Sequence, residues 1–466
     1  MFSGAEFRRV DSSGDRGSPF SFWPPPRLAS SPLAVSCIRK FPRSGEAAIR
    51  ESCDVGTQGG GFVTRYRRDP AEEITASRAR LATRLGTKDL RWVVSPYRIC
   101  PLGAHIDHQG GPVLGMAITG HTLLAFRESG DGTCRFLSEN YPGEVGFDIN
   151  DSNFESWPEA SPPWNSYAVG ASVLIREKIS GRARGVEVCS LGFLPGSGLS
   201  SSASVTLGYI TALAAVNGVK LEDRERVVLA QRVENEWAEV ACGILDPASI
   251  VGSRRDHLLS IDTEKLSWET LASADSTPGF RILVAYTGLP RNLAETGFNS
   301  RVQECGRAAR DIARRAGLEG VARLGDLPAD VLERELGGCE PVLEKRARHF
   351  HEERWRVHQG IDAWQLGDLE RFGELMSDSC RSSRENFETG SPELVKLNEI
   401  MVGCEGVYGA RFSGAGFGGS AIGLVAEGMA ESAQAAIETK FIREYPGLAG
   451  KFRCYLVDSD DGLRLA

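Results

Sequence analysis

The pattern of hydrophobic and polar positions predicts helices and strands that are mixed along most of the chain, from about residue 69 onward. Short apolar or alternating runs predict strands at 90–94, 113–118, 122–126, 134–137, 185–189, 257–261, 280–285 and 421–425. Apolar residues at helical spacing predict helices at about 69–86, 164–178, 203–215, 223–242, 299–317, 342–364 and 394–401. Because helices dominate after residue 280, we expect one domain at 69–280 and a second at 281–466.

Residues 1–68 follow a different pattern. They mix Ser, Gly, Pro and Arg without a sustained helical or strand period, so we expect a disordered N-terminal extension. Its serines and arginines would suit a plastid transit peptide, but its six acidic residues weigh against that interpretation. An untargeted tail on a cytoplasmic protein is the favoured interpretation.

Composition narrows the classes of function. Of the 466 residues, 41% are hydrophobic and 25% are charged, which is typical of a globular protein. The formal net charge of −8 argues against broad binding to nucleic acid or to an anionic membrane, and no run approaches the ~20 apolar residues of a membrane span. The 11 cysteines lack a CxxC pair, so we expect free thiols in a reducing compartment. The oligomeric state stays open, and a monomer is possible.

A glycine- and serine-rich loop at 193–204 precedes a predicted apolar helix. Gly196 and Gly198 allow a tight turn in which successive backbone N–H groups face one point, and Ser200, Ser201 and Ser202 add hydroxyl groups. Such a loop at a helix N-terminus favours phosphate. A plain surface turn is the alternative. No Lys-Ser or Lys-Thr follows the glycines, which excludes a Walker-type loop, and Ser at position 201 does not match the dinucleotide fingerprint.

Polar side chains gather in the segment 95–111. Arg98, His105, Asp107, His108 and Gln109 fall within a dozen positions, which suits a ligand with several hydroxyl groups, although a solvated loop is the alternative.

Two carboxylates near a later helix are further candidates. Glu234 lies beside the apolar face of the predicted helix 223–242, and Asp246 follows in what we expect to be a turn projecting into a cleft. An ordinary Asp-Pro turn would explain Asp246 equally well.

A second glycine cluster lies at 409–420. Gly414, Gly416 and Gly419 match the letters of a dinucleotide motif, but a predicted strand follows where that motif needs a helix. We therefore expect a loop whose backbone presses against a bound phosphate or against the first glycine loop.

Together these stretches resemble the three motifs of the GHMP kinases, and the resemblance covers about residue 90 to the C-terminus. It implies an α+β fold with two domains: an N-terminal mixed α/β nucleotide-binding domain, a C-terminal ferredoxin-like α+β domain, and an active site between them. Within the family, Arg98, His105 and Asp107, the segment 242–246 and the segment 345–349 resemble galactokinases. The segment 96–110 is similar to plant galacturonokinases.

The resemblance implies a sugar-1-kinase that uses ATP and Mg²⁺. Catalysis would rest on Asp246, which orients or deprotonates the anomeric hydroxyl, and on Arg98, which stabilises the developing charge. Ser202 and Glu234 would hold Mg²⁺. The expected sugar-binding residues are Arg98, Ala104, His105, Asp107, Asp246 and Phe298. The expected ATP-binding residues are Pro195, Gly196, Ser197, Gly198, Leu199, Ser200, Ser201, Ser202, Ala203, Gly414 and Gly416.

Two departures from galactokinases bear on the substrate. Galactokinases carry Glu where this chain has Ala104, and that Glu accepts a hydrogen bond from the 6-hydroxyl of galactose; the chain also has Phe298 where they have Tyr. If C6 of the sugar is a carboxylate, two like charges about 4 Å apart would repel by roughly 4 kcal/mol at an effective dielectric of 20. We therefore expect D-galacturonic acid as the substrate. A kinase for galactose or arabinose and a non-catalytic sugar sensor are the alternatives.

Overall fold

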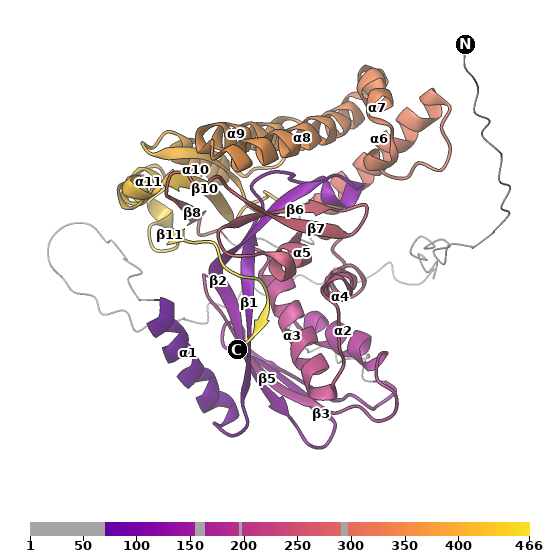
Figure 1. Cartoon of the computed structure of the whole chain (residues 1–466), viewed down its shortest axis with the longest axis vertical. Coiled ribbons are helices and arrows are strands. Elements are labelled where there is room, and N and C mark those ends of the chain that lie inside the picture. Colours follow the sequence, from indigo (N-terminus) through magenta and orange to yellow (C-terminus); the bar gives the residue numbers. More distant parts are fainter. Residues whose placement is uncertain (1–69, 154–163, 195–197, 290–296) are drawn as a thin grey trace, which may run out of the picture. The chain divides into compact units, whose positions relative to one another are not determined.

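The computed structural model describes residues 70–153, 164–194, 198–289 and 297–466 (Figure 1). The predicted extension 1–68 lies outside the described residues. The strands are β1 (Arg91–Ile99), β2 (Val113–Glu128), β3 (Thr133–Ser138), β4 (Glu144–Asp148), β5 (Val186–Gly192), β6 (His257–Asp262), β7 (Ser267–Ala272), β8 (Phe280–Tyr286), β9 (Val407–Phe412), β10 (Ser420–Ala426), β11 (Arg453–Val457) and β12 (Arg464–Leu465). The α-helices are α1 (Pro70–Leu85), α2 (Asn165–Arg176), α3 (Ser201–Asn217), α4 (Asp223–Glu236), α5 (Leu245–Gly252), α6 (Phe298–Ala316), α7 (Ala329–Glu335), α8 (Pro341–Leu366), α9 (Leu369–Glu385), α10 (Pro392–Val402) and α11 (Ala430–Glu444).

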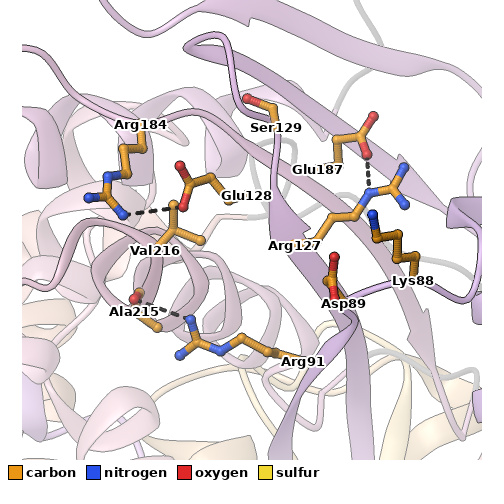
Figure 2. Close-up of a pocket in the computed structure, with 10 residues that line it drawn as sticks. All are labelled: Lys88, Asp89, Arg91, Arg127, Glu128, Ser129, Arg184, Glu187, Ala215 and Val216. Carbon is orange, nitrogen blue, oxygen red and sulfur yellow. Dashed lines mark hydrogen bonds and ion pairs between the residues drawn. The ribbon is translucent and has the colours of Figure 1, made fainter.

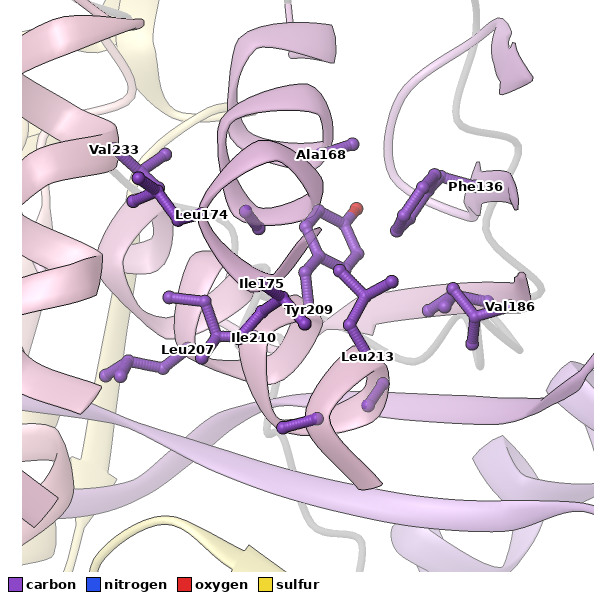
Figure 3. Packing of buried hydrophobic residues seen from close by; sticks show 14 of the residues in the cluster. Phe136, Ala168, Leu174, Ile175, Val186, Leu207, Tyr209, Ile210, Leu213 and Val233 are labelled. Atoms are coloured by element: carbon purple, nitrogen blue, oxygen red, sulfur yellow. The ribbon is translucent and has the colours of Figure 1, made fainter. Parts of the chain in front are cut away.

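The first sheet contains the strand order β12-β1-β2-β5-β3-β4, with β6 and β7 attached along β2. Two strands predicted at 113–118 and 122–126 are in fact one strand, β2, whose first part pairs with β6 and whose second part pairs with β5. Its side chains alternate between two layers. Leu124 and Phe126 face the core formed with α2, α3 and α4, which Figure 3 shows, while Leu123 and Ala125 pack with Leu81 of α1 on the other face.

The second sheet has the strand order β11-β8-β10-β9, and its neighbouring strands are antiparallel. Helices α6 to α10 connect β8 to β9, and α11 connects β10 to β11. This order and these crossovers are those of a ferredoxin-like βαββαβ unit, so the expected α+β fold is confirmed.

The division at residue 280 stays a prediction. The two sheets lie on either side of it in sequence, but one apolar cluster contains Ile99 and Leu114 together with Ile282, Trp364 and Ile422. The two sequence halves therefore share buried surface.

The last described residues return to the first sheet. Leu465 of β12 pairs with Val93 of β1, and the N–H of Asp460 donates to the carbonyl of Ala117 in β2. The N–H of Leu463 donates to the carbonyl of Ile250 in α5. The segment 458–466 thus ties β1, β2 and α5 together.

Candidate active site

Arg98 and Asp246 form the centre of the site. Arg98 lies near the end of β1, and both its Nε and its Nη2 contact Asp246 Oδ1, at 2.8 and 2.7 Å. The hydroxyl of Ser200 donates to the other carboxylate oxygen, Oδ2. The Arg98 side chain is 4% exposed and that of Asp246 is 23% exposed, so the carboxylate is the member of the pair that a ligand can reach.

Asp246 does not lie in a turn, as the sequence suggested, but in the first turn of α5. Proline is tolerated in a first helical turn because its missing N–H would have no helical partner there, so Pro247 continues the helix. The positive end of a helix dipole also favours a carboxylate at this position.

The preceding helix, α4, ends at Glu236 and not at residue 242 as predicted. Val240 and Cys242 continue the apolar spacing, but the side-chain amide oxygen of Asn235 accepts the backbone N–H of Cys242 at 3.1 Å. Glu239 has a left-handed φ of 55°. A local side-chain contact of this kind competes with helix continuation, and apolar spacing alone does not reveal it.

The first glycine loop leads into α3 through residues with left-handed backbone angles. Gly198 has φ 105°, and Ser200 has φ 59° at the N-cap of α3. Arg98 Nη1 donates to the carbonyl of Gly198 at 3.0 Å, so a hydrogen bond joins the glycine loop directly to the predicted catalytic pair. Ser201 is exposed, Ser202 is half-buried and Leu199 and Ala203 are buried. Pro195, Gly196 and Ser197 lie outside the described residues.

The second glycine cluster packs against the first. A Cβ atom at Gly198 would lie 2.5 Å from the carbonyl oxygen of Ser413, and the Ser413 hydroxyl donates to the carbonyl of Gly198. Gly414 and Gly416 have φ values of 70° and 76°, which favour glycine. The two glycine loops are thus in contact through Ser413, the residue immediately before the stretch 414–419 that was expected to make the contact.

Glu234 and Ser202 fit a small hard cation. Glu234 of α4 is buried, and its Oε1 has no hydrogen-bond partner among the described residues, while its Oε2 accepts from the thiol of Cys242 at 3.1 Å. Burial, then the charge of Asp246, raises the pKa of Glu234, and the hydroxyl of Ser202 opposes that rise. A bound cation would offset both unfavourable effects. No group of three or more His, Cys, Asp or Glu in the described ranges could hold a metal, so remaining ligands would come from phosphate oxygens and water, as is usual for Mg²⁺.

The segment 103–109 contacts the start of α5, the helix that carries Asp246. His105 has φ 61°, and its ring stacks on that of Phe387 with centroids 4.4 Å apart and lies 6.3 Å from that of Phe298. Asp107 Oδ2 accepts the N–H of Leu245, the residue before Asp246, at 3.3 Å. A Cβ atom at Gly243 would lie 2.3 Å from the same oxygen, so glycine is required there.

Asp107 is electrostatically coupled to Asp246. Burial, then the negative charge of Asp246, raises the pKa of Asp107 to about 6. A group with this pKa accepts hydrogen bonds from sugar hydroxyls when ionised and donates one when protonated.

The backbone of Ala104 is held on both sides by α8, which the sequence did not reveal. Glu353 Oε1 accepts the N–H groups of Gly103 and Ala104 at 2.9 and 3.1 Å. His349 Nε2 donates to the carbonyl of Ala104 at 2.8 Å, and its Nδ1 accepts from the hydroxyl of Ser382 at 2.9 Å. The helix itself was predicted at 342–364, and the resemblance of the segment 345–349, which contains His349, to galactokinases was the only signal in the sequence that connected α8 with the site.

A pocket of about 680 Å³ lies at the other end of β1 (Figure 2). Arg91, which lines it, is seven residues from Arg98, or about 23 Å along a strand. Arg127 pairs with Glu187, Arg184 pairs with Glu128, and Arg91 donates to the carbonyl of Ala215. The arginines that line this pocket are therefore paired with protein groups, and the pocket is separate from the site around Asp246.

Comparison with known proteins gives the family. The GHMP kinases N terminal domain model matches residues 166–253, and the GHMP kinases C terminal model matches residues 361–443. A galacturonokinase of Arabidopsis thaliana is 37% identical over 381 residues, which are 78% of this chain and 89% of that protein.

The chain belongs to the GHMP kinase family. A galactokinase of Clostridium beijerinckii is 32% identical over 391 residues, 82% of this chain and 96% of that protein. The crystal structure of Lactococcus lactis galactokinase complexed with galactose has 29% identity and a TM-score of 0.74 and covers 84% of this chain and 99% of that one. This GHMP kinase lies in the galactokinase and galacturonokinase branch of the family. Its described residues include no helix long and apolar enough to cross a membrane.

The structure brings most of the sequence-predicted residues of this GHMP kinase together. Direct contacts link Arg98, Asp246, Gly198 and Ser200, and a backbone contact links Asp107 to the residue before Asp246. Phe298 joins His105. The assignments of individual residues to ATP, sugar and Mg²⁺ stay predictions.

Proposed function

We propose that this chain is an ATP-dependent sugar 1-kinase that phosphorylates the anomeric hydroxyl of D-galacturonate to give α-D-galacturonate 1-phosphate. The observation that carries the proposal is the Arg98–Asp246 pair, which lies between the glycine loop at the start of α3 and the polar segment 103–109. Phosphoryl transfer needs a positioned hydroxyl, a proton acceptor and positive charge near the phosphates, and this arrangement supplies all three.

Each group has a role in the proposed reaction. Asp246 orients the anomeric hydroxyl and accepts its proton as the oxygen attacks the γ-phosphorus. Arg98 holds the carboxylate in place through two N–H groups and stabilises the negative charge on the transferred group. Backbone N–H groups at the N-terminus of α3 bind phosphate oxygens. When bound, Mg²⁺ neutralises part of the charge on ATP, and Ser202 and Glu234 are the side chains that would hold it.

Two observations favour a uronate over a neutral sugar. Ala104 places no carboxylate at the position where galactokinases carry Glu, so an anionic C6 group meets no like charge at that position. The relative with 37% identity is a galacturonokinase. The galactokinase relatives support the second candidate, a kinase for galactose or arabinose. The presence of Arg98, Ser202 and Asp246 disfavours a non-catalytic sensor.

The decisive experiment compares kcat/KM for D-galacturonate, D-glucuronate, D-galactose and L-arabinose with the purified protein and MgATP. We expect galacturonate to be preferred and the phosphate to be attached at C1, which phosphorus NMR of the product identifies. A preference for galactose or arabinose would establish the second candidate. Binding of sugar with no turnover of any of the four would reject the kinase proposal.

A further inference from the structure

Gln109 fixes the hydrogen-bonding state of its neighbour His108. The backbone N–H of Leu324 donates to Gln109 Oε1 at 3.2 Å, and Gln109 is buried. Because a backbone N–H can only donate, the oxygen of the Gln109 amide must face Leu324. Its NH₂ group then faces His108.

The amide nitrogen of Gln109 lies 2.9 Å from His108 Nδ1. An NH₂ group can only donate, so Nδ1 must be the acceptor and cannot carry a proton. Burial, and to a smaller extent His349, lowers the pKa of His108 to about 4, so the ring is neutral at physiological pH. A neutral imidazole has one N–H, and here that N–H is at Nε2.

Among the described residues, this Nε2–H has no acceptor. The atom is buried and has no hydrogen-bond partner in the part of the chain that the structure describes. Buried donors without an acceptor are rare in folded proteins, and they occur where a ligand or water completes the contact. The donor is also held in place, because Leu324 and Gln109 fix the orientation of the ring.

His108 lies next to a predicted sugar-binding residue, Phe298. Its ring is edge-on to that of Phe298, with centroids 5.9 Å apart, and lies 6.4 Å from that of Phe387. Phe387 stacks on His105, and His349, whose charge state influences His108, holds the carbonyl of Ala104. The donor therefore lies in an aromatic environment formed by Phe298 and Phe387, the same two rings that lie against His105.

We propose that His108 is a specificity-determining residue whose Nε2–H donates to the C6 carboxylate of the sugar. This inference rests on the proposed function and names the group that recognises the acid. A carboxylate only accepts hydrogen bonds and carries charge, so it gains more from a fixed donor in apolar surroundings than a hydroxyl does. The ring of Phe298, at the start of α6, is half-buried and meets the His108 ring edge-on.

Two amide substitutions test the inference as a matched pair. The side-chain amide of Gln reaches the position of the imidazole Nε2, whereas that of Asn reaches only the position of Nδ1. We expect His108→Asn to lower kcat/KM for galacturonate by on the order of 10- to 100-fold, the usual cost of losing a hydrogen bond to a charged group. We expect kcat/KM for galactose to change less than threefold, and His108→Gln to recover most of the loss.

Melting temperatures within about 2 °C of the wild type establish that both variants fold. Equal losses for galacturonate and galactose, or no loss for either, would overturn the assignment of His108 to the carboxylate. Isothermal titration calorimetry gives a second measurement that does not depend on turnover: the binding of galacturonate and of galactose to the wild type and to each of the two variants. Selective galacturonate binding that is lost in His108→Asn, in a protein without kinase activity, would leave this inference standing while rejecting the proposed function.

Discussion

Removing the charge of Glu353 should destabilise the protein in a way that depends on pH. Glu353 is fully buried, and besides the N–H groups of Gly103 and Ala104 it accepts from Arg356 Nε at 2.6 Å and from the hydroxyl of Ser379. Burial, the largest single effect, would raise the pKa of this carboxyl, but the charges of Arg356, His349 and Arg411 and the hydrogen bond from Ser379 together outweigh burial and lower the pKa to about 2. In Glu353→Gln, an amide oxygen still accepts hydrogen bonds while the charge is gone.

The lowered pKa of Glu353 gives the expected loss of folding stability in Glu353→Gln. A fall from the ordinary value of 4.5 to about 2 corresponds to about 3 kcal/mol of stability at neutral pH. Because the pKa is lowered on folding, this stability is fully present above pH 4.5 and is lost as the pH falls towards 2. At pH 3.5 about 2 kcal/mol would remain. For a folded region of this size, about 3 kcal/mol corresponds to a fall in Tm of roughly 4 °C.

The assay is calorimetric melting of the wild type and of Glu353→Gln at pH 7 and at pH 3.5. We expect the difference in Tm to be largest at pH 7 and to narrow at pH 3.5. We also expect KM for the sugar to rise more than KM for ATP, since Glu353 holds the backbone of Ala104. Glu388→Gln is the matched control, because the pKa of Glu388 is also about 2 while its side chain is 35% exposed, so water screens the effect and the loss should be smaller. A difference for Glu353→Gln that is independent of pH would refute the assigned role of its charge.

Three further predictions concern catalysis, substrate and the extension. Asp246→Asn should lower kcat by on the order of 10² or more with little change in ATP binding, and near-normal turnover would remove Asp246 from the mechanism. Ala104→Glu should lower the ratio of kcat/KM for galacturonate over galactose by on the order of 10² or more through repulsion of the C6 carboxylate, and an unchanged ratio would show that position 104 does not face C6. Deleting residues 1–68 should leave Tm and activity nearly unchanged. Deleting residues 1–85, the control, should lower Tm because Leu81 and Leu85 are buried. An equal fall in Tm for the shorter deletion would contradict the prediction of a disordered extension.

Local chemistry made some of the site predictable from the sequence. Gly198 and Gly414 need backbone angles that few other residues adopt, so the glycine loops stood out. The end of α4 was mispredicted because Asn235 stops the helix through a side-chain contact that apolar spacing does not encode. The hydrogen bond from the N–H of Gly103 to Glu353 could not be predicted either. It joins residues 250 positions apart, and a single charged residue on a helix is ordinarily solvated.

The return of β12 to β1 has a consequence for how the protein is made. During translation the ribosome has to synthesise more than three hundred residues after β1 before Leu465 pairs with Val93. Until then Val93 and Val94 of β1 lack the partners that they have opposite β2 in the described structure, and an open strand edge is a template for pairing with other chains. The nascent first sheet is therefore open to mispairing at these two positions until the late segment has been synthesised. Because the same late segment also binds α5, the helix that carries Asp246 gains this contact only after Leu463 has been synthesised.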